Sequence, residues 1–306
     1  MDDATALGYV DSVRAAVRGG INFLDTSLNY RHQESERNFG EALSTLFESG
    51  EFDRAEIAIC TKAGYLVPNA MPQSGVGPDD IVGRMHCLTP AFLADQLGRS
   101  LANLRVDSVD VFYLHNPETQ LQFVSPAEFE KRIAAAFAAC EEMAAAGRLS
   151  FYGTATWNGY RTREREEGLS VTRLAAIARE VGGETHRFRF IQLPLNLAML
   201  EGVTFPRETI DGENVSTVEA ARRLGIASIA SASLLQTRLA QGLPETVRDN
   251  LPGLETDAQR AIQFARSAPG IVSALVGMST PAHVAENLKV AGVAPANLSA
   301  WFRPSH

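Results

Sequence analysis

The feature that most constrains this fold is a regular alternation of short apolar segments with segments of helical periodicity. Seven short runs rich in apolar and β-branched residues occur along the chain, and each is followed by a segment whose apolar residues recur at helical spacing. Runs this apolar are typical of strands buried on both faces, as in parallel sheets covered by helices. The predicted strands span residues 21–27, 57–62, 109–115, 151–157, 190–196, 226–231 and 271–276.

Helices are predicted after these strands and also before the first of them. Residues 4–18 carry apolar side chains at helical spacing, and Gly19-Gly20 follows as a stop signal. Thr280 before Pro281 puts a capping hydroxyl ahead of a proline at the first helical position. The other helices are predicted at residues 34–47, 90–104, 126–146, 171–181, 215–224, 258–267 and 281–290.

The alternation is typical of an α/β protein with either a barrel or an open doubly wound sheet. No Gly-x-Gly-x-x-Gly follows the first strand, although a classical dinucleotide-binding sheet needs that motif for its phosphate turn. Polar residues recur at strand ends all along the chain, which favours a TIM-type (β/α)8 barrel with one shared mouth. They are Asp25, Lys62, His115, Thr156 and Gln192.

Two further properties bear on this barrel. Only seven strands are found where a closed barrel has eight, so we expect either a late start of the recorded sequence or a gap in the barrel. The segments 64–88 and 234–254 follow strands and are long for loops, so they are expected to overhang the mouth.

Size and charge indicate a single domain spanning residues 1–306. The chain is 45% hydrophobic, which suffices for one large core. Its formal net charge is -8 and it has no long run of Lys or Arg, so neither a nucleic acid nor a membrane is expected as a partner. No stretch of ~20 uninterrupted apolar residues occurs, and the start Met1-Asp2-Asp3 lacks a leader pattern, so a cytoplasmic protein is expected.

The three cysteines, Cys60, Cys87 and Cys140, are an odd number without close spacing. This pattern argues against a disulfide framework or a zinc site and favours small buried thiols. We therefore expect no bound metal.

The side chains suited to chemistry follow three successive predicted strands. Tyr30 is a weak acid that releases a proton near neutral pH only beside a group that stabilises its phenolate. Lys62 is such a cation, and Asp25 would keep that lysine charged and oriented. His115 is suited to bond a substrate oxygen or to share the proton transfer. Alternatively, each side chain is structural, or Lys62 forms a Schiff base with a carbonyl substrate.

Three motifs together resemble those of the aldo-keto reductase family. They are Gly-Gly-Ile-Asn-Phe-Leu-Asp-Thr-Ser-x-x-Tyr at residues 19–30, Thr61-Lys62, and Asp-x-x-Asp-x-x-x-x-His-x-Pro at residues 107–117. The resemblance implies that Tyr30 is the general acid, that Lys62 and Asp25 activate it, and that His115 orients the substrate carbonyl. It also implies hydride transfer between a nicotinamide cofactor at the barrel mouth and a small-molecule aldehyde, ketone or alcohol.

The resemblance further implies a set of cofactor contacts. Gln192 and Thr156 would bind the nicotinamide carboxamide, Thr156 standing where the family usually has asparagine. Leu195 replaces the tyrosine that stacks on the nicotinamide ring. NADP is expected. NAD stays possible because His283, a weaker phosphate partner than a guanidinium, stands where an arginine is common in members specific for NADP. The adenosine-phosphate segment would comprise Gly277, Ser279, Thr280, His283 and Asn287.

Two points remain open in the sequence. Family members usually begin with a hairpin and a first barrel strand, whereas residues 3–19 here already match the first helix, which would leave two strand edges unpaired. An alternative is therefore a cofactor-binding barrel with little or no activity. Trp157, at a strand end, is expected to line either an apolar substrate pocket or the core.

Overall fold

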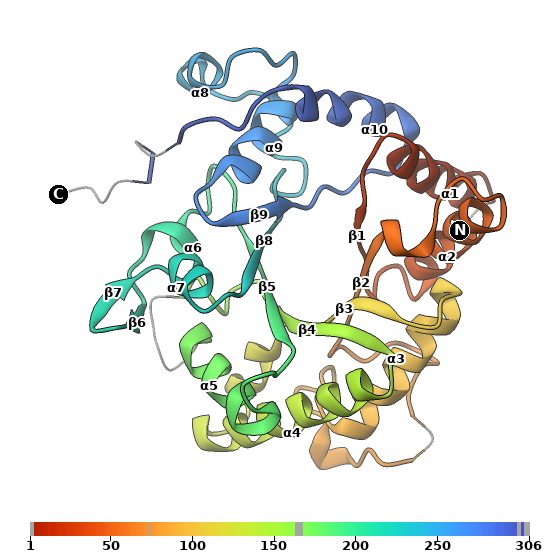
Figure 1. Ribbon diagram of the computed structural model, residues 1–306, viewed down its shortest axis with the longest axis vertical. Helices are drawn as coiled ribbons and strands as arrows, with labels where there is room; N and C mark the ends of the chain where they lie inside the picture. Colours follow the sequence, from red (N-terminus) through yellow and green to blue (C-terminus); the bar gives the residue numbers. More distant parts are fainter. Residues whose placement is uncertain (1–2, 73, 163–167, 299–300, 303–306) are drawn as a thin grey trace.

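The computed structural model describes residues 3–72, 74–162, 168–298 and 301–302. Seven parallel strands form one curled sheet in the order β1-β2-β3-β4-β5-β8-β9, and the long helices surround it on the outside (Figure 1). The sequence prediction of a TIM-type barrel with seven strands is confirmed. The strands are β1 (Phe23–Asp25), β2 (Ala58–Ala63), β3 (Val109–His115), β4 (Leu149–Ala155), β5 (Phe188–Pro194), β8 (Ala227–Ser231) and β9 (Ile271–Ala274).

The helices follow the predicted segments closely, and several begin at a side-chain hydroxyl that accepts a backbone N–H. The Thr89 side chain accepts from Phe92, and the Thr280 side chain accepts from His283. The long helices are α1 (Asp3–Arg18), α2 (Glu34–Glu48), α3 (Pro90–Leu104), α4 (Pro126–Ala145), α5 (Val171–Gly182), α7 (Thr217–Arg223), α9 (Asp257–Ser267) and α10 (Pro281–Leu288).

Sequence patterns missed two short α-helices and two short strands of the described chain. The helices are α6 (Glu201–Thr204) and α8 (Glu245–Asn250). The strands, β6 (Glu208–Ile210) and β7 (Glu213–Val215), pair as an antiparallel hairpin outside the main sheet.

The core lies between the sheet and the helices. Outward-facing strand residues such as Phe112 and Ile191 are fully buried against helix residues such as Leu43, Leu97 and Phe137. Burying each such side chain contributes about 2 kcal/mol. This layer fixes the strand register, and with it the positions of the strand ends. The three cysteines lie buried and unpaired, as the sequence predicted.

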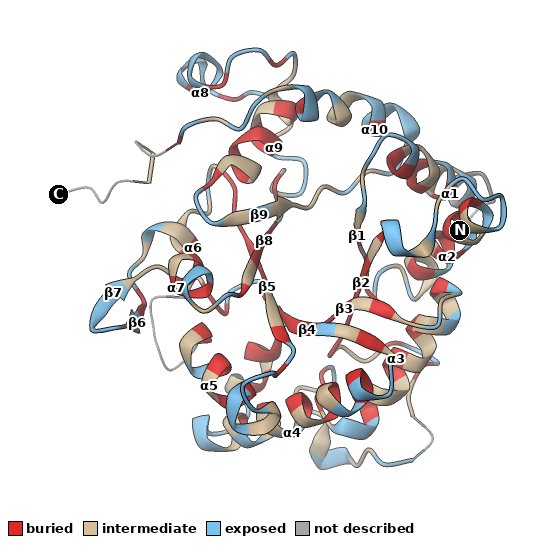
Figure 2. Ribbon diagram, in the orientation of Figure 1, coloured by how far each residue is buried: buried red, intermediate tan, exposed pale blue. Residues whose placement is uncertain are grey.

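The sheet does not close on itself within the described residues, because β1 pairs only with β2 and β9 only with β8. Both edge strands are less buried than the central ones (Figure 2), and Val272 of β9 is 69% exposed. Outside the gap, α1 packs against α10, where Gly19 leaves room for Leu288. Helices therefore span an opening that no strand fills in the described chain.

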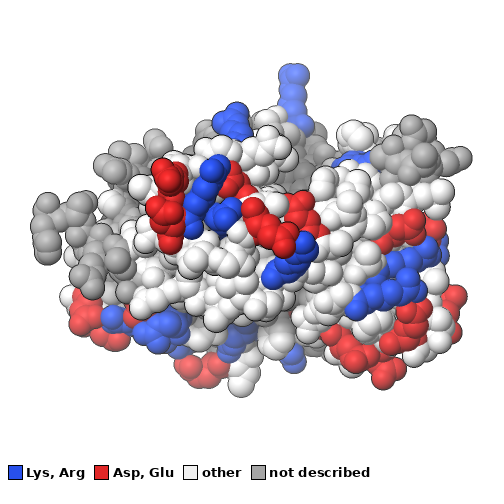
Figure 3. Space-filling model, turned by 90° about the horizontal axis from the view of Figure 1, so that it is seen from above, with Lys and Arg blue, Asp and Glu red and all other residues white. Residues whose placement is uncertain are grey.

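Charged side chains are intermixed on the face of the molecule shown in Figure 3, where no large patch of one sign is seen. On the side that carries α8 to α10, Arg248 lies 3.0 Å from Asp257, and Lys289 lies 2.6 Å from Glu255. Among the helices of the described segments, none is long and apolar enough to cross a membrane.

Candidate active site

Three charged or polar side chains meet at one rim of the sheet because their strands run parallel. Asp25 ends β1, Lys62 lies near the end of β2, and His115 ends β3. The register of β1 on β2 and of β2 on β3 brings these ends side by side. The structure thus gathers the strand-end residues that the sequence singled out.

Lys62 and Asp25 form a buried ion pair. The Lys62 side chain is 0% exposed and the Asp25 side chain 9%, and Lys62 Nζ donates to Asp25 Oδ1 at 2.5 Å and to the Thr26 carbonyl at 2.8 Å. Burial lowers the pKa of the Lys62 ammonium, but Asp25 and then Tyr30 outweigh burial, so that pKa is raised above its ordinary value. Lys62 is therefore a permanent cation at neutral pH.

Tyr30 lies above this pair in the turn that follows β1. Its residue is 39% exposed, which leaves the side chain accessible to a small molecule. Lys62 Nζ lies 5.0 Å from the centre of the Tyr30 ring, and the His115 ring meets the Tyr30 ring edge-on at 5.9 Å. One exposed phenol thus borders both the buried cation and the imidazole.

His115 presents a neutral imidazole. Burial, followed by the charge of Lys62, holds the pKa of His115 well below its ordinary value. Ser27 Oγ lies 3.3 Å from His115 Nδ1 and donates to Asn29 Oδ1 at 2.7 Å. A neutral ring carries one N–H. The single hydroxyl hydrogen of Ser27 goes to Asn29 in this arrangement, so the His115 hydrogen lies on Nε2 only when Ser27 turns from Asn29 to donate to Nδ1.

Gln192 and Thr156 lie next to this group. The side-chain amide of Gln192, in β5, donates to Asp25 Oδ2 at 2.9 Å, and the Gln192 backbone carbonyl accepts the Thr156 backbone N–H at 2.9 Å. The Thr156 hydroxyl is buried and has no hydrogen-bond partner in the described chain. A buried hydroxyl without a partner costs free energy, so this position is suited to a polar group of a ligand.

Trp157 follows β4 in a loop held by a buried carboxylate. The residue is 38% exposed, and Glu118 Oε1 accepts the backbone N–H groups of Trp157, Asn158 and Gly159, each at 3.1 Å. The sequence patterns did not single out Glu118. Its signal was its place three residues after His115, in the turn that leaves β3.

Replacing Glu118 with leucine is expected to cost on the order of 3 kcal/mol of unfolding free energy, because three N–H groups lose their acceptor. Glu118→Gln keeps one acceptor oxygen. Burial raises the pKa of Glu118, against the opposing effect of backbone N–H groups. A carboxyl whose pKa is higher when folded stabilises most while protonated, and this contribution falls as pH rises through the folded value. The unfolding free energy of Glu118→Gln, measured with urea, should therefore rise relative to that of wild type as the pH is raised from acid to neutral. A difference that stays constant with pH would contradict this expectation.

Leu195 is not brought to this rim. It lies just after β5, is 0% exposed, and packs with Ala230, Ala265 and Ala268 on the helix side of the sheet. Its stacking role stays a prediction that this placement does not favour.

The residues expected at the adenosine phosphate lie at the start of α10. Gly277, Ser279, Thr280 and His283 are exposed, and Asn287 is half-buried in the last turn of the helix. A β-carbon at Gly8 of α1 would lie 3.7 Å from the Ser279 carbonyl, so this segment borders α1. The exposed first turn of α10 is open to an anion.

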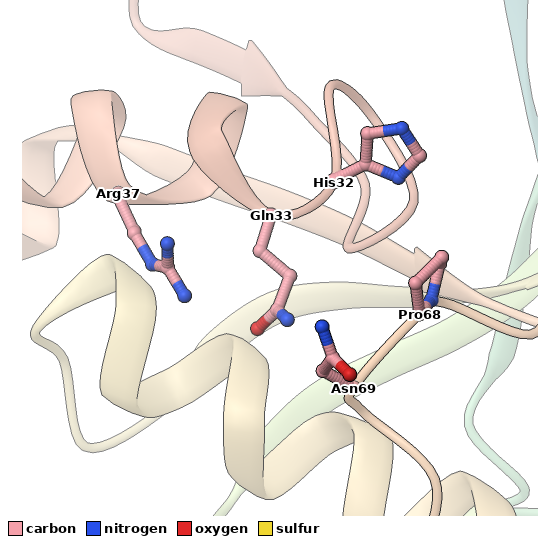
Figure 4. Close-up of a pocket in the computed structure, with 5 residues that line it drawn as sticks. All are labelled: His32, Gln33, Arg37, Pro68 and Asn69. Carbon is pink, nitrogen blue, oxygen red and sulfur yellow. The ribbon is translucent and has the colours of Figure 1, made fainter.

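A pocket of about 380 Å³ opens beside the turn that carries Tyr30 (Figure 4). His32, Gln33 and Arg37 line it from the α2 side, and Pro68 and Asn69 line it from the loop after β2. His32, Gln33 and Asn69 have φ values of 53°, 77° and 62°, a left-handed conformation that is unfavourable for residues other than glycine. The lining is polar, and sequence patterns did not indicate it.

A sequence model described as the Aldo/keto reductase family matches residues 2–176, which is more than half of the chain. The protein belongs to the aldo-keto reductase family. The motifs that carried the resemblance all lie within this match, and the rim of Asp25, Lys62 and His115 is built from them.

Known proteins are similar to this aldo-keto reductase in sequence or in fold. D-threo-aldose 1-dehydrogenase from a Pseudomonas species is 25% identical over 302 residues, covering 92% of this chain and 82% of the relative. An aldo-keto reductase from Klebsiella pneumoniae, solved in complex with NADPH, superposes with a TM-score of 0.67 at 18% identity, covering 99% and 88% of the two chains. The holo form of an aldo-keto reductase from Bacillus halodurans gives a TM-score of 0.64 at 16% identity, covering 94% and 83%.

Proposed function

We propose that this aldo-keto reductase catalyses the reversible reduction of an aldehyde or ketone to an alcohol by hydride transfer from NADPH, with NADH as the alternative. The observation that carries the proposal is the buried Asp25–Lys62 ion pair, which lies beneath the accessible ring of Tyr30 and beside the neutral ring of His115. We further propose that residues 1–306 form a single barrel domain.

Each side chain of this group has a distinct part in the proposed reaction. A nicotinamide bound at the rim supplies or accepts the hydride. With Ser27 turned to donate to its Nδ1, His115 donates Nε2–H to the carbonyl oxygen and so orients and polarises it. Tyr30 protonates that oxygen as the hydride arrives, and the ammonium of Lys62 stabilises the phenolate left behind. In the reverse direction the phenolate takes the alcohol proton.

The ion pair argues against a Schiff base at Lys62. A lysine nucleophile needs a free amine, which proteins obtain by lowering its pKa. Here Asp25 and Tyr30 raise the pKa of Lys62, so the nitrogen lone pair is occupied by a proton. Carbonyl reduction uses that charge, whereas a lyase would have to remove it.

The residues near the rim fit a nicotinamide. The partnerless Thr156 hydroxyl and the Gln192 amide provide a donor and an acceptor for a carboxamide at one place. Leu195 is withdrawn into the helix layer, so we propose no stacking on the ring from that residue. The exposed first turn of α10, with Ser279 and Thr280, suits the adenosine phosphate. The Klebsiella relative named above carries NADPH in its structure.

Replacing His283 with arginine should tighten NADPH binding about 10-fold, because a guanidinium binds a phosphate through two charged hydrogen bonds. NADH lacks the 2′-phosphate, so its affinity should stay the same. Fluorescence titration with each cofactor measures both values. Ala282→Arg adds the same charge one residue away, on another side of the helix. If affinity rises equally for NADPH and NADH, or equally in His283→Arg and Ala282→Arg, a specific contact between residue 283 and the 2′-phosphate is ruled out.

The substrate we propose is a polar, hydroxylated carbonyl compound. The pocket beside the turn that carries Tyr30 is lined by an imidazole, two amides and a guanidinium, groups that bond hydroxyls better than they bond alkyl chains; they belong to His32, Gln33, Asn69 and Arg37. The similarity to a D-threo-aldose 1-dehydrogenase supports this class.

The test is the fall in NADPH absorbance during incubation with aldoses, with hydroxylated aldehydes and ketones, and with simple alkyl aldehydes. The reverse reaction is measured as the rise in NADPH absorbance when NADP is incubated with aldoses. We expect turnover of hydroxylated substrates with a higher kcat/KM than of alkyl aldehydes. Tight cofactor binding with no turnover of any of these compounds would refute the proposed reaction.

A second candidate is a barrel that binds the cofactor but turns over little or no substrate. The observation favouring it is that β1, which carries Asp25, is an edge strand of only three residues, and β2 is its one paired neighbour among the residues that the structure describes. The absorbance assay separates the two candidates directly.

A further inference from the structure

His86 is a buried histidine that the proposed reaction does not use. It lies at the end of the loop between β2 and α3 and is fully buried. Its Nε2 lies 2.8 Å from the backbone carbonyl oxygen of His115. A histidine ring thus contacts the main chain of the residue that carries the candidate substrate-orienting ring.

The His115 carbonyl needs such a partner because β2 ends early. The paired register of β2 on β3 stops at Ala63 and Leu114, one residue before His115. At that point the chain turns away, and the Gly64 carbonyl accepts the N–H of Cys87 in the loop. The His86 ring therefore occupies the place where the next residue of the strand would donate, and a buried carbonyl without any donor would cost stability.

The direction of every hydrogen bond in this group follows from Arg132, a permanent donor. Arg132 Nη1 donates to Gln120 Oε1 at 2.8 Å, which leaves the Gln120 amide nitrogen to donate to His86 Nδ1 at 2.9 Å. With Nδ1 accepting, a neutral His86 carries its hydrogen on Nε2, towards the His115 carbonyl. Burial lowers the pKa of His86 to about 4, so the ring is neutral at neutral pH.

The surrounding space is shaped around this contact. A β-carbon on Gly64 would lie 2.5 Å from the His115 carbonyl oxygen and 2.7 Å from His86 Nε2, so a side chain there would break the bond. The Tyr65 ring stands edge-on to the rings of both His86 and His115, at 5.2 Å from each. Tyr65 is itself fixed by Asn116, whose amide donates to its hydroxyl at 2.9 Å.

We propose that His86 is a positioning residue for His115: its Nε2–H replaces the missing strand donor and holds the end of β3 so that the His115 ring faces Tyr30. The role rests on the proposed function, in which His115 orients the substrate carbonyl. Gln120 and Arg132 act through His86 by fixing where its hydrogen lies.

The test compares His86→Gln with His86→Met, two side chains of nearly equal size. Glutamine retains an N–H donor at about the reach of Nε2, and methionine has none. His186→Met is the control for loss of a histidine, since His186 lies before β5, away from the mouth, and contacts Arg189. The readouts are kcat and KM for carbonyl reduction, the cofactor dissociation constant, and the ring ¹⁵N and ¹H resonances of His115.

His86→Met should lower kcat about 100-fold, the scale of effect of a small misplacement of a reacting group, while the cofactor dissociation constant stays within 2-fold of wild type. Its His115 resonances should shift, because the ring moves relative to Tyr30 and Tyr65. His86→Gln should recover most of both properties, and His186→Met should alter neither.

The His115 ring resonances test the positioning role of His86 independently of turnover. Unchanged His115 signals in His86→Met, or equal losses in the Gln and Met variants, would overturn the positioning role. If the wild-type protein reduces no carbonyl compound, the proposed function fails. A His115 shift in His86→Met that is reversed in His86→Gln would still support His86 as the residue that holds His115.

Discussion

Replacing Tyr30 with phenylalanine is expected to lower kcat for carbonyl reduction about 10³-fold, the middle of the range for loss of a general acid. The substitution removes only the hydroxyl that delivers the proton, and it leaves the Asp25–Lys62 pair and the ring contact with His115 in place. Cofactor affinity should therefore change less than 2-fold. Single-turnover absorbance and fluorescence titration measure the two quantities.

Tyr160→Phe provides the matched control, because it removes a hydroxyl that is buried and bonded to Thr154 at 2.6 Å. Its turnover should stay close to that of wild type. Turnover retained in Tyr30→Phe would assign the proton transfer to another group, whereas lost cofactor binding would point to a disturbed rim.

Replacing Asp25 with asparagine should combine two large effects. Lys62 Nζ is fully buried, and its other hydrogen-bond partner among the described residues is the neutral Thr26 carbonyl, so the ammonium would lose its compensating charge. Breaking a buried ion pair from one side typically costs about 3–5 kcal/mol of unfolding free energy. Catalysis should fall as well, because a lysine that sheds its proton no longer stabilises the Tyr30 phenolate. Urea unfolding and kcat measure these effects.

A surface pair tests whether burial is the cause. Glu219→Gln removes the partner of Arg222 on the exposed side of α7, where water screens the charges. Its loss of stability should be far smaller than that of Asp25→Asn. If the two variants unfold at the same urea concentration, the Asp25–Lys62 pair does not contribute as its burial indicates.

The sheet could be predicted from the sequence because its inner strands are apolar on both faces and its helices carry strong stop and cap signals. The hairpin of β6 and β7 was missed because its strands are three residues long and mostly polar. A local signal was present: Asp211-Gly212, with φ values of 53° and 79°, forms the tight turn that favours antiparallel strands.

The candidate site was predicted in its members but not in its contacts. A strand end can be found from the chain, so Asp25, Lys62 and His115 were found. Contacts depend on the register between distant segments. Gln192 was expected only at the cofactor, yet its amide bonds Asp25, which lies 167 residues earlier. Glu118 was invisible to patterns because its three partners are main-chain groups near residue 158.

The gap between β1 and β9 gives the Asp25–Lys62 bond a second consequence. In a closed barrel every strand is fastened along both sides, so each strand end is held by its neighbours. Here β1 spans three residues and, within the described chain, pairs with β2 alone, with Asp25 opposite Cys60 at its last position. The Asp25–Lys62 ion pair joins the same two strands and so holds the edge strand β1 against β2. The Asp25–Lys62 ion pair that supports proton transfer by Tyr30 therefore also holds β1, the strand that ends at Asp25, in its place in the sheet.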